Sequence, residues 1–178
     1  MISRYAYLLV AVAAVAACSR AEQVTPEDGF ERLVNNSVAL TNTSTPVYFN
    51  AHTKGWSKRR FRVADVQRSL TASSPDNKCE RIGSVTFKLE ISQTDFAATE
   101  AEATAITTYT SSPSLFDVAV TYCFVSDRWS TKRINYEQMI LGDRVAFDLK
   151  PSQIVADRTS SPNAGLYYWT DKASSAAP

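Results

Sequence analysis

Apolar and polar residues alternate over Val85–Ile91, where Thr86, Lys88 and Glu90 separate the apolar side chains. A period of two with one apolar face is typical of a strand that packs one face against a core. Phe116–Val125 is instead apolar at nearly every position. That pattern predicts a central strand that is covered on both faces.

A β-hairpin is predicted where Ile134–Leu141 and Val145–Leu149 flank Gly142-Asp143. A two-residue loop that begins with glycine fits a type II′ turn. Counted outward from that loop, Ile140 faces Val145. In this register one face of the hairpin is mainly apolar, as is required of a sheet that packs on a core.

Further short strands are expected from β-prone runs bounded by polar turn segments. These runs are Val38–Thr41, Val47–Phe49, Ala103–Tyr109, Ile154-Val155 and Leu166–Trp169. Short helical turns are expected at Pro26–Leu33, where acidic residues occupy the first turn, and at Phe96–Ala101. The chain as a whole is therefore expected to be rich in strands.

Many short strands with turn signals between them predict a mainly β fold, an antiparallel β-sandwich. The strand, turn and strand of Val38–Phe49 are similar in outline to immunoglobulin-like envelope domains. An alternative is an α+β fold with one helix packed on an antiparallel meander. That helix would span Ser57–Leu70, with Val63, Val66 and Leu70 on one stripe.

The first seventeen residues have the pattern of an export signal. Arg4 supplies a positive charge, Tyr5–Ala17 is an unbroken apolar run, and small residues close it. A helix needs about 20 apolar residues to cross a bilayer, and this run is shorter. It is therefore interpreted as a signal peptide, which is not part of the folded domain.

The end of this run, Val15-Ala16-Ala17-Cys18, resembles the lipobox of bacterial lipoproteins. The resemblance covers only the leader, and it implies that Cys18 becomes the acylated first residue of the mature protein. Ser19 follows Cys18. The absence of aspartate at this position resembles the pattern of lipoproteins that are sent to the outer membrane, where the protein would face the periplasm. Two or three acyl chains would hold the protein firmly on a membrane. An ordinary leader cut after Ala21 is the alternative.

The expected organisation is a signal peptide over 1–17, a lipidated tether over 18–25, one β-rich domain over 26–171 and a flexible tail over 172–178. The chain has 178 residues, 44% of them hydrophobic, which suffices for one domain with a core. It carries 19 basic and 18 acidic residues, and loss of Arg4 with the leader makes the two equal. Nucleic-acid binders usually show a clear basic excess, so no nucleic-acid partner is expected.

Two cysteines remain after Cys18, and an even pair in an exported protein predicts a disulfide between Cys79 and Cys123. Closing a loop of that size stabilises a fold by about 4 kcal/mol in the chain-entropy model. Two free buried thiols are the alternative. A lone histidine with two distant cysteines does not make a zinc ligand set, so no metal is expected.

Sequence motifs of catalysis are missing. His52 is the only histidine, and it follows a strand-like run, so it is expected on the surface or in a turn. The chain contains no G-x-S-x-G elbow, H-E-x-x-H motif, P-loop or dinucleotide fingerprint. These observations predict a protein that is not an enzyme and needs no cofactor, with a small hydrolase as a remote alternative.

Basic and aromatic residues gather in one segment of the expected domain. Its members are Lys54, Trp56, Lys58, Arg59, Arg60 and Arg62. In an extended strand Lys58, Arg60 and Arg62 share one face, which could meet phosphates, carboxylates or an acidic protein surface. The structural interpretation is a solvated edge whose charges prevent pairing with other chains. Trp129, in the loop after Phe116–Val125, is either an exposed anchor or a lid folded back on the core.

Taken together, these features predict a non-catalytic lipoprotein of the bacterial envelope. It would act as an accessory or adaptor component of an envelope assembly, tethered to the membrane by its lipid and binding a protein or glycan. A periplasmic inhibitor or immunity protein, acting against a toxin or a lysozyme-like enzyme, is the alternative.

Overall fold

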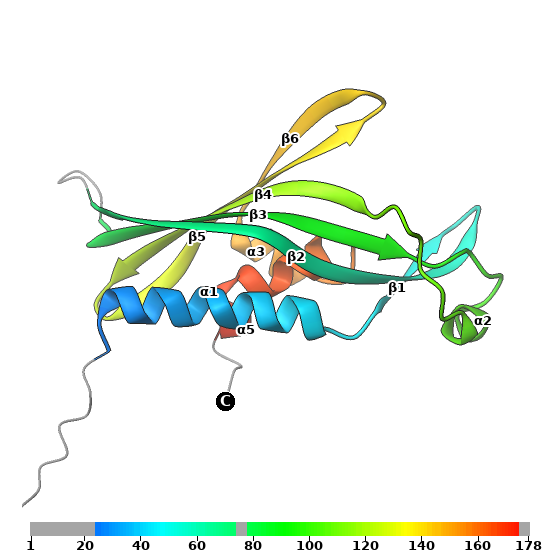
Figure 1. Cartoon of the computed structure of the whole chain (residues 1–178), viewed down its shortest axis with the longest axis horizontal. Coiled ribbons are helices and arrows are strands. Elements are labelled where there is room, and N and C mark those ends of the chain that lie inside the picture. Colours follow the sequence, from blue (N-terminus) through cyan, green and yellow to red (C-terminus); the bar gives the residue numbers. More distant parts are fainter. Residues whose placement is uncertain (1–23, 74–77, 175–178) are drawn as a thin grey trace, which may run out of the picture.

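The computed structural model describes residues 24–73 and 78–174, and these form a mainly β fold, as expected. Six antiparallel strands make one curled sheet in which each strand pairs with its neighbour in the chain (Figure 1). The strands are β1 (Val47–Ala51), β2 (Gly55–Ala72), β3 (Arg81–Gln93), β4 (Ser114–Val125), β5 (Arg128–Ile140) and β6 (Asp143–Leu149). All described strands belong to this sheet, so the two facing sheets of a sandwich are not confirmed.

The helices are α1 (Pro26–Thr43), α2 (Glu100–Ala105), α3 (Pro151–Ala156), α4 (Asn163–Leu166), the 3₁₀ turn η1 (Tyr167–Trp169) and α5 (Asp171–Ser174). Helix α1 begins at the expected place, because Thr25 caps it and Pro26 occupies its first turn. It continues well beyond Leu33, so the strand expected at Val38–Thr41 is wrong.

Buried residues along α1 follow helical spacing. Phe30, Val34, Ser37 and Thr41 recur at intervals of three or four, and each is at most 2% exposed. The hydroxyls of Ser37 and Thr41 donate to backbone carbonyls four residues earlier, at 3.0 and 2.8 Å, so their burial leaves no donor unpaired. Burial of this stripe against the sheet outweighs the local β preference of Val38–Thr41.

Helix α1 and the segment from α3 to α5 pack on the same face of the sheet (Figure 1). The Phe30 ring lies over Gly83 in β3, and Trp169 stacks on Phe87 with ring centroids 4.0 Å apart. Strand β4 is central, as expected, but only one of its faces is covered along Phe116–Tyr122. Asp117 points to the other face and is exposed, which corrects the expectation of burial on both sides.

Strand β2 occupies the range of the alternative helix Ser57–Leu70, which is therefore wrong. Phe61 and Val63 are buried and the intervening Arg62 is exposed, so the segment has the period of a strand. The arginines and β-branched residues here suit a half-exposed strand, and β3 pairs with it over most of its length.

The predicted hairpin exists as β5 and β6, but its loop is Leu141-Gly142 and Ile140 pairs with Asp143, not Val145. Both loop residues have positive φ, 53° and 93°, which is the pattern of a type I′ turn and not the expected II′ turn. The pairing is shifted by two residues, so the faces are unchanged and Tyr136 stacks on Phe147.

Three other expected strands are absent: two of them are helical, and Ala103–Tyr109 is helical only to Ala105 and irregular beyond it. Ile154-Val155 lies in α3, where Pro151 occupies the first turn, and Leu166–Trp169 forms the end of α4 and η1. Ala103–Tyr109 begins inside α2, whose Thr99 and Glu102 form a capping box. In α2 the cap residues outweigh the β preference of the segment that follows.

The disulfide between Cys79 and Cys123 is present, with Cα atoms 5.3 Å apart. It joins the segment before β3 to β4, and Glu80 donates its amide to the Phe124 carbonyl beside it at 2.8 Å. Helix α5 extends to Ser174, into the range expected to be a tail. The predicted signal peptide, Cys18 and most of the tether lie outside the described residues.

Candidate functional site

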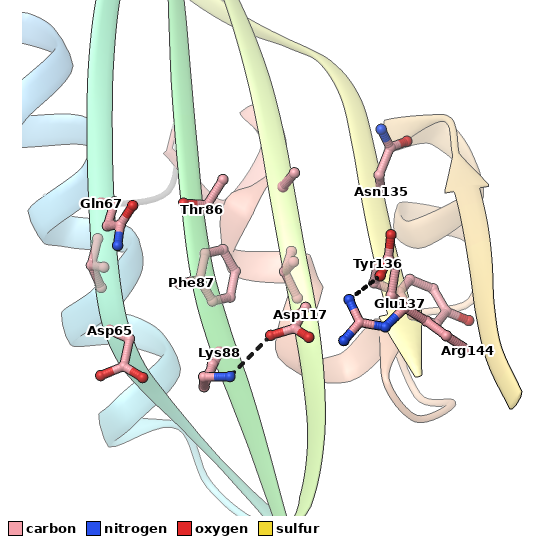
Figure 2. A pocket seen from close by; sticks show the side chains of 13 residues that line it. Asp65, Gln67, Thr86, Phe87, Lys88, Asp117, Asn135, Tyr136, Glu137 and Arg144 are labelled. Carbon is pink, nitrogen blue, oxygen red and sulfur yellow. Dashed lines mark hydrogen bonds and ion pairs between the residues drawn. The ribbon is translucent and has the colours of Figure 1, made fainter. Parts of the chain in front are cut away.

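The face of the sheet opposite the helices carries an open groove of about 700 Å³. Strands β2 to β5 form its floor, and Arg144 of β6 closes one side (Figure 2). Its polar lining side chains are Asp65, Gln67, Thr86, Lys88, Asp117, Asn135, Glu137 and Arg144. Because strand residues alternate between faces, these side chains point away from the core that α1 covers.

A bulge and a small side chain hollow this face. The register of β2 against β3 shifts between Ala64 and Gln67, and Asp65 adopts a positive φ of 54° there. Such a bulge bends the strand and increases its twist. In the middle of the floor Ala119 pairs with Thr86 on one side and Asn135 on the other, and its methyl group leaves room above the sheet.

Two ion pairs cross the groove. Lys88 Nζ lies 3.2 Å from Asp117 Oδ1, and Arg144 Nη1 lies 3.0 Å from Glu137 Oε2. Asp117 and Glu137 are directly opposite each other in β4 and β5, so each cation offsets one of two adjacent like charges. All four side chains remain partly exposed, so these pairs contribute little to stability and stay accessible to a ligand.

One polar atom of the floor lacks a partner. The Oδ1 atom of Asn135 is buried and accepts no hydrogen bond in the described structure. An amide oxygen in this position can accept a hydrogen bond from a ligand N–H or O–H group. Asn135 lies on β5 at one side of the groove, and the charges of Lys88, Asp117, Glu137 and Arg144 lie away from it (Figure 2).

The groove lacks an exposed aromatic platform. Phe87 and Tyr136 line it, but they are only 3% and 8% exposed. Their rings belong to the buried side, where Phe87 stacks on Trp169 and Tyr136 on Phe147, and burial raises the pKa of Tyr136. Without such a platform the groove suits backbone amides and charged side chains better than the flat face of a sugar.

The basic and aromatic segment of the sequence analysis lies at the end of the sheet, and its cations have partners within the chain. Lys54 lies over Phe96, Lys58 donates to the Thr104 carbonyl, Arg59 lies 3.6 Å from the Phe49 ring centroid, Arg60 lies over Tyr109, and Arg62 lies 3.9 Å from Glu90. Burial lowers the pKa of Arg59. Arg60 and Arg62 do share a face, as predicted, but Lys58 is 9% exposed beneath α2.

Both aromatic members of the predicted site make contacts within the chain. Trp56 exchanges two backbone hydrogen bonds with Ala97, each 2.7 Å. The indole of Trp129 donates to the Pro26 carbonyl at 3.0 Å and packs on Phe30 and Phe124. Trp129 therefore has the arrangement of a lid on the core, which was the alternative to an exposed anchor.

His52 lies exposed in the turn between β1 and β2, in keeping with its expected place. The neighbouring hollow is lined by Asn50, Lys54, Arg59 and Gln93 among others, and includes no carboxylate. Among the described residues no group of His, Cys, Asp or Glu side chains is placed to hold a metal ion. No helix within 24–73 or 78–174 is long and apolar enough to cross a membrane.

Sequence reasoning missed the groove because its residues come from five strands. The alternation over Val85–Ile91 did indicate a polar face with Thr86 and Lys88 on it. The register that places Lys88 beside Asp117, and Asp117 beside Glu137, depends on pairing between strands and is not visible in the sequence.

Comparison with protein-family models finds no match for this chain, and comparisons with curated proteins and with solved structures find none either.

Proposed function

We propose that this chain is a non-catalytic accessory component of a bacterial cell-envelope assembly, and that it holds a protein partner along the groove. The observation that carries the proposal is the division of the sheet into one face covered by α1 and the segment from α3 to α5, and an opposite polar face that carries the open groove over β2 to β5. A face with exposed charges of both signs is suited to a polypeptide of complementary charge.

The sequence of the leader supports the proposed location in the cell envelope. The resemblance to a lipobox implies a lipid on Cys18, and α1 begins at Pro26, eight residues later. A chain of that length spans at most about 28 Å. The domain would then stay close to the membrane surface, as suits a member of a fixed assembly on the periplasmic side of the outer membrane.

Binding of a protein has more support than binding of a glycan, because the groove lacks an exposed aromatic ring. The alternative role as an inhibitor or immunity protein would use a projecting loop, for example at Trp129 or in the Lys54–Arg62 segment. Packing of Trp129 beneath α1 gives that role less support.

A pull-down from native envelope, after mild cross-linking, tests the proposal. The bait is the full tagged chain, compared with Ala119→Tyr, which fills the floor of the groove. Thr121→Tyr is the matched control, since it places the same side chain on the same face of β4 but outside the groove. We expect wild type and Thr121→Tyr to recover the same subunits and Ala119→Tyr to lose them.

The same samples test the alternatives. Recovery of one soluble enzyme that loses activity on mixing would favour the inhibitor role. Equal recovery by all three baits would refute the groove as the binding site. The intact mass of the bait, measured by mass spectrometry, reports acylation at Cys18. An unmodified cysteine would overturn the proposed location on the membrane.

A further inference from the structure

Strand β6 forms an open edge of the sheet. It spans Asp143–Leu149, pairs with β5 on one side, and within the described residues has no strand on the other. The hairpin also projects beyond the body of the sheet, because pairing of β4 with β5 ends at Phe116 and Gln138 (Figure 1). Edge strands with free backbone groups are the usual place for a further strand to add.

The side chains of β6 are self-complementary about Ala146. In an antiparallel pair of two copies centred on Ala146, Asp143 of one copy faces Leu149 of the other, so all seven strand residues are paired. Arg144 then faces Asp148, and Val145 faces Phe147, each twice. The charged pairs lie on the polar face and the apolar pairs on the core face, which preserves the two faces of the sheet.

Existing contacts extend this complementarity. Arg133 donates two hydrogen bonds to Asp148, of 2.8 and 2.7 Å, and Arg144 is paired with Glu137. In the pair, four charged side chains would lie in a row across the interface. Arg133 and Asp148 of one copy come first, followed by Arg144 and Glu137 of the second copy. Charges alternate in sign along that row, and the two-fold axis repeats it.

Neighbouring registers lack this match. Pairing centred on Val145 places Asp148 opposite Gly142 and Arg144 opposite Ala146, so both charge pairs are lost. Pairing centred on Phe147 places Arg144 opposite Lys150. Pairing centred on Arg144 or Asp148 places two like charges face to face, which is destabilising.

Exposed apolar side chains next to β6 also favour the pairing of two copies. Leu141 at the hairpin tip is 102% exposed, and Met139 beside it is 60% exposed. The register centred on Ala146 brings Leu141 level with Pro151 of the second copy, at the start of α3. A contact there would remove exposed apolar surface that the single copy leaves in water.

We propose that two copies of this chain associate through their β6 strands, in antiparallel register about Ala146, to form one continuous twelve-stranded sheet. The polar faces of the two copies then join into a single surface. This inference does not depend on the proposed partner of the groove, because it concerns the chain alone.

Cysteine cross-linking of the full chain in mild detergent tests the register. At the axis the Cβ atoms of two Ala146 residues would be about 5 Å apart, within reach of a disulfide. Residues at 144, or at 148, would be about 14 Å from their own counterparts. Ala146→Cys should therefore cross-link rapidly on oxidation, whereas Arg144→Cys and Asp148→Cys should each fail alone but cross-link when mixed.

The wild-type chain measures any background cross-linking through Cys18, and circular dichroism confirms that each variant is folded. Position 146 is exposed, so these substitutions leave the core intact. Failure of Ala146→Cys, or equal cross-linking of all three variants alone, would overturn the proposal.

Charge reversal provides a second measurement, by sedimentation equilibrium. Arg144→Asp alone and Asp148→Arg alone each convert both charge pairs into repulsive ones, and the dissociation constant should rise about 10- to 100-fold. An equimolar mixture of the two variants restores both attractions, so it should form a mixed dimer with near wild-type affinity. A wild-type chain that stays monomeric at high concentration, or a mixture no tighter than either variant, would contradict the inference.

Discussion

The contact between α1 and the sheet depends on the absence of a side chain at Gly83. A Cβ atom there would lie 2.4 Å from Phe30 Cε2 and 2.8 Å from its Cδ2, well inside van der Waals contact. Phe30 is fully buried and its ring also meets Tyr122 and Trp129, so it has no free space to move into. Gly83→Ala should therefore destabilise the protein by about 1–3 kcal/mol.

The size of this effect should depend on Phe30. Phe30→Ala removes the ring and by itself should cost about 3–5 kcal/mol. In that background Gly83→Ala meets no clash, and alanine in a strand is favoured over glycine by about 0.5–1 kcal/mol. The substitution should then be neutral or stabilising, which gives a coupling energy of about 1–4 kcal/mol between the two positions.

Urea unfolding followed by circular dichroism measures all four proteins of this cycle. With a slope of about 2 kcal/mol/M, the loss in Gly83→Ala corresponds to a midpoint lower by about 1 M urea. Gly29→Ala is the control, because its Cβ would be 3.5 Å from Trp129, an ordinary contact, and alanine favours the helix. The same loss from Gly83→Ala in both backgrounds would refute the packing of α1 on β3.

Three further outcomes follow from the structure. Replacing both Cys79 and Cys123 by alanine opens a loop with a sequence separation of 44. The free energy of unfolding, measured in thermal or urea melts, should then fall by about 4 kcal/mol. Unchanged stability would exclude a structural role for the disulfide. Burial holds the pKa of Tyr122 far above its ordinary value of 10.0, so the unfolded state ionises first and stability should fall above about pH 10, by up to 1.4 kcal/mol per pH unit. Tyr122→Phe should make that alkaline decline shallower in pH-dependent melts, and an identical slope would count against the burial. Gly55→Ala should cost at least about 1 kcal/mol, because φ is +91° and a Cβ would lie 2.2 Å from the Ala97 carbonyl oxygen; a melt equal to wild type would contradict this contact.

Strands with strong alternation were predictable from the sequence. Val85–Ile91 and the hairpin around Gly142 are where the pattern placed them, because burial of one face imposes a period of two. The exact loop was not predictable, since Leu141 is an unusual residue for positive φ and nothing local distinguishes Leu141-Gly142 from Gly142-Asp143.

The remaining elements depend on tertiary contacts. Val38–Thr41 has the composition of a strand, yet the buried stripe of Phe30, Val34, Ser37 and Thr41 keeps it helical. Ser57–Leu70 shows a helical stripe and is nevertheless a strand, because β3 is present to pair with it. The groove on the polar face is a product of such pairing, so single-sequence patterns identify its residues only one strand at a time.

Strict sequential pairing of the strands has a consequence for the time course of folding. Each strand can join the sheet as soon as it follows its neighbour, so sheet formation can proceed in the order of synthesis. The core cannot close in that order, because Trp169 must still stack on Phe87 and is fully buried there. A nascent chain that has reached β6 therefore still exposes the part of the apolar face that Trp169 covers, until the last helices arrive.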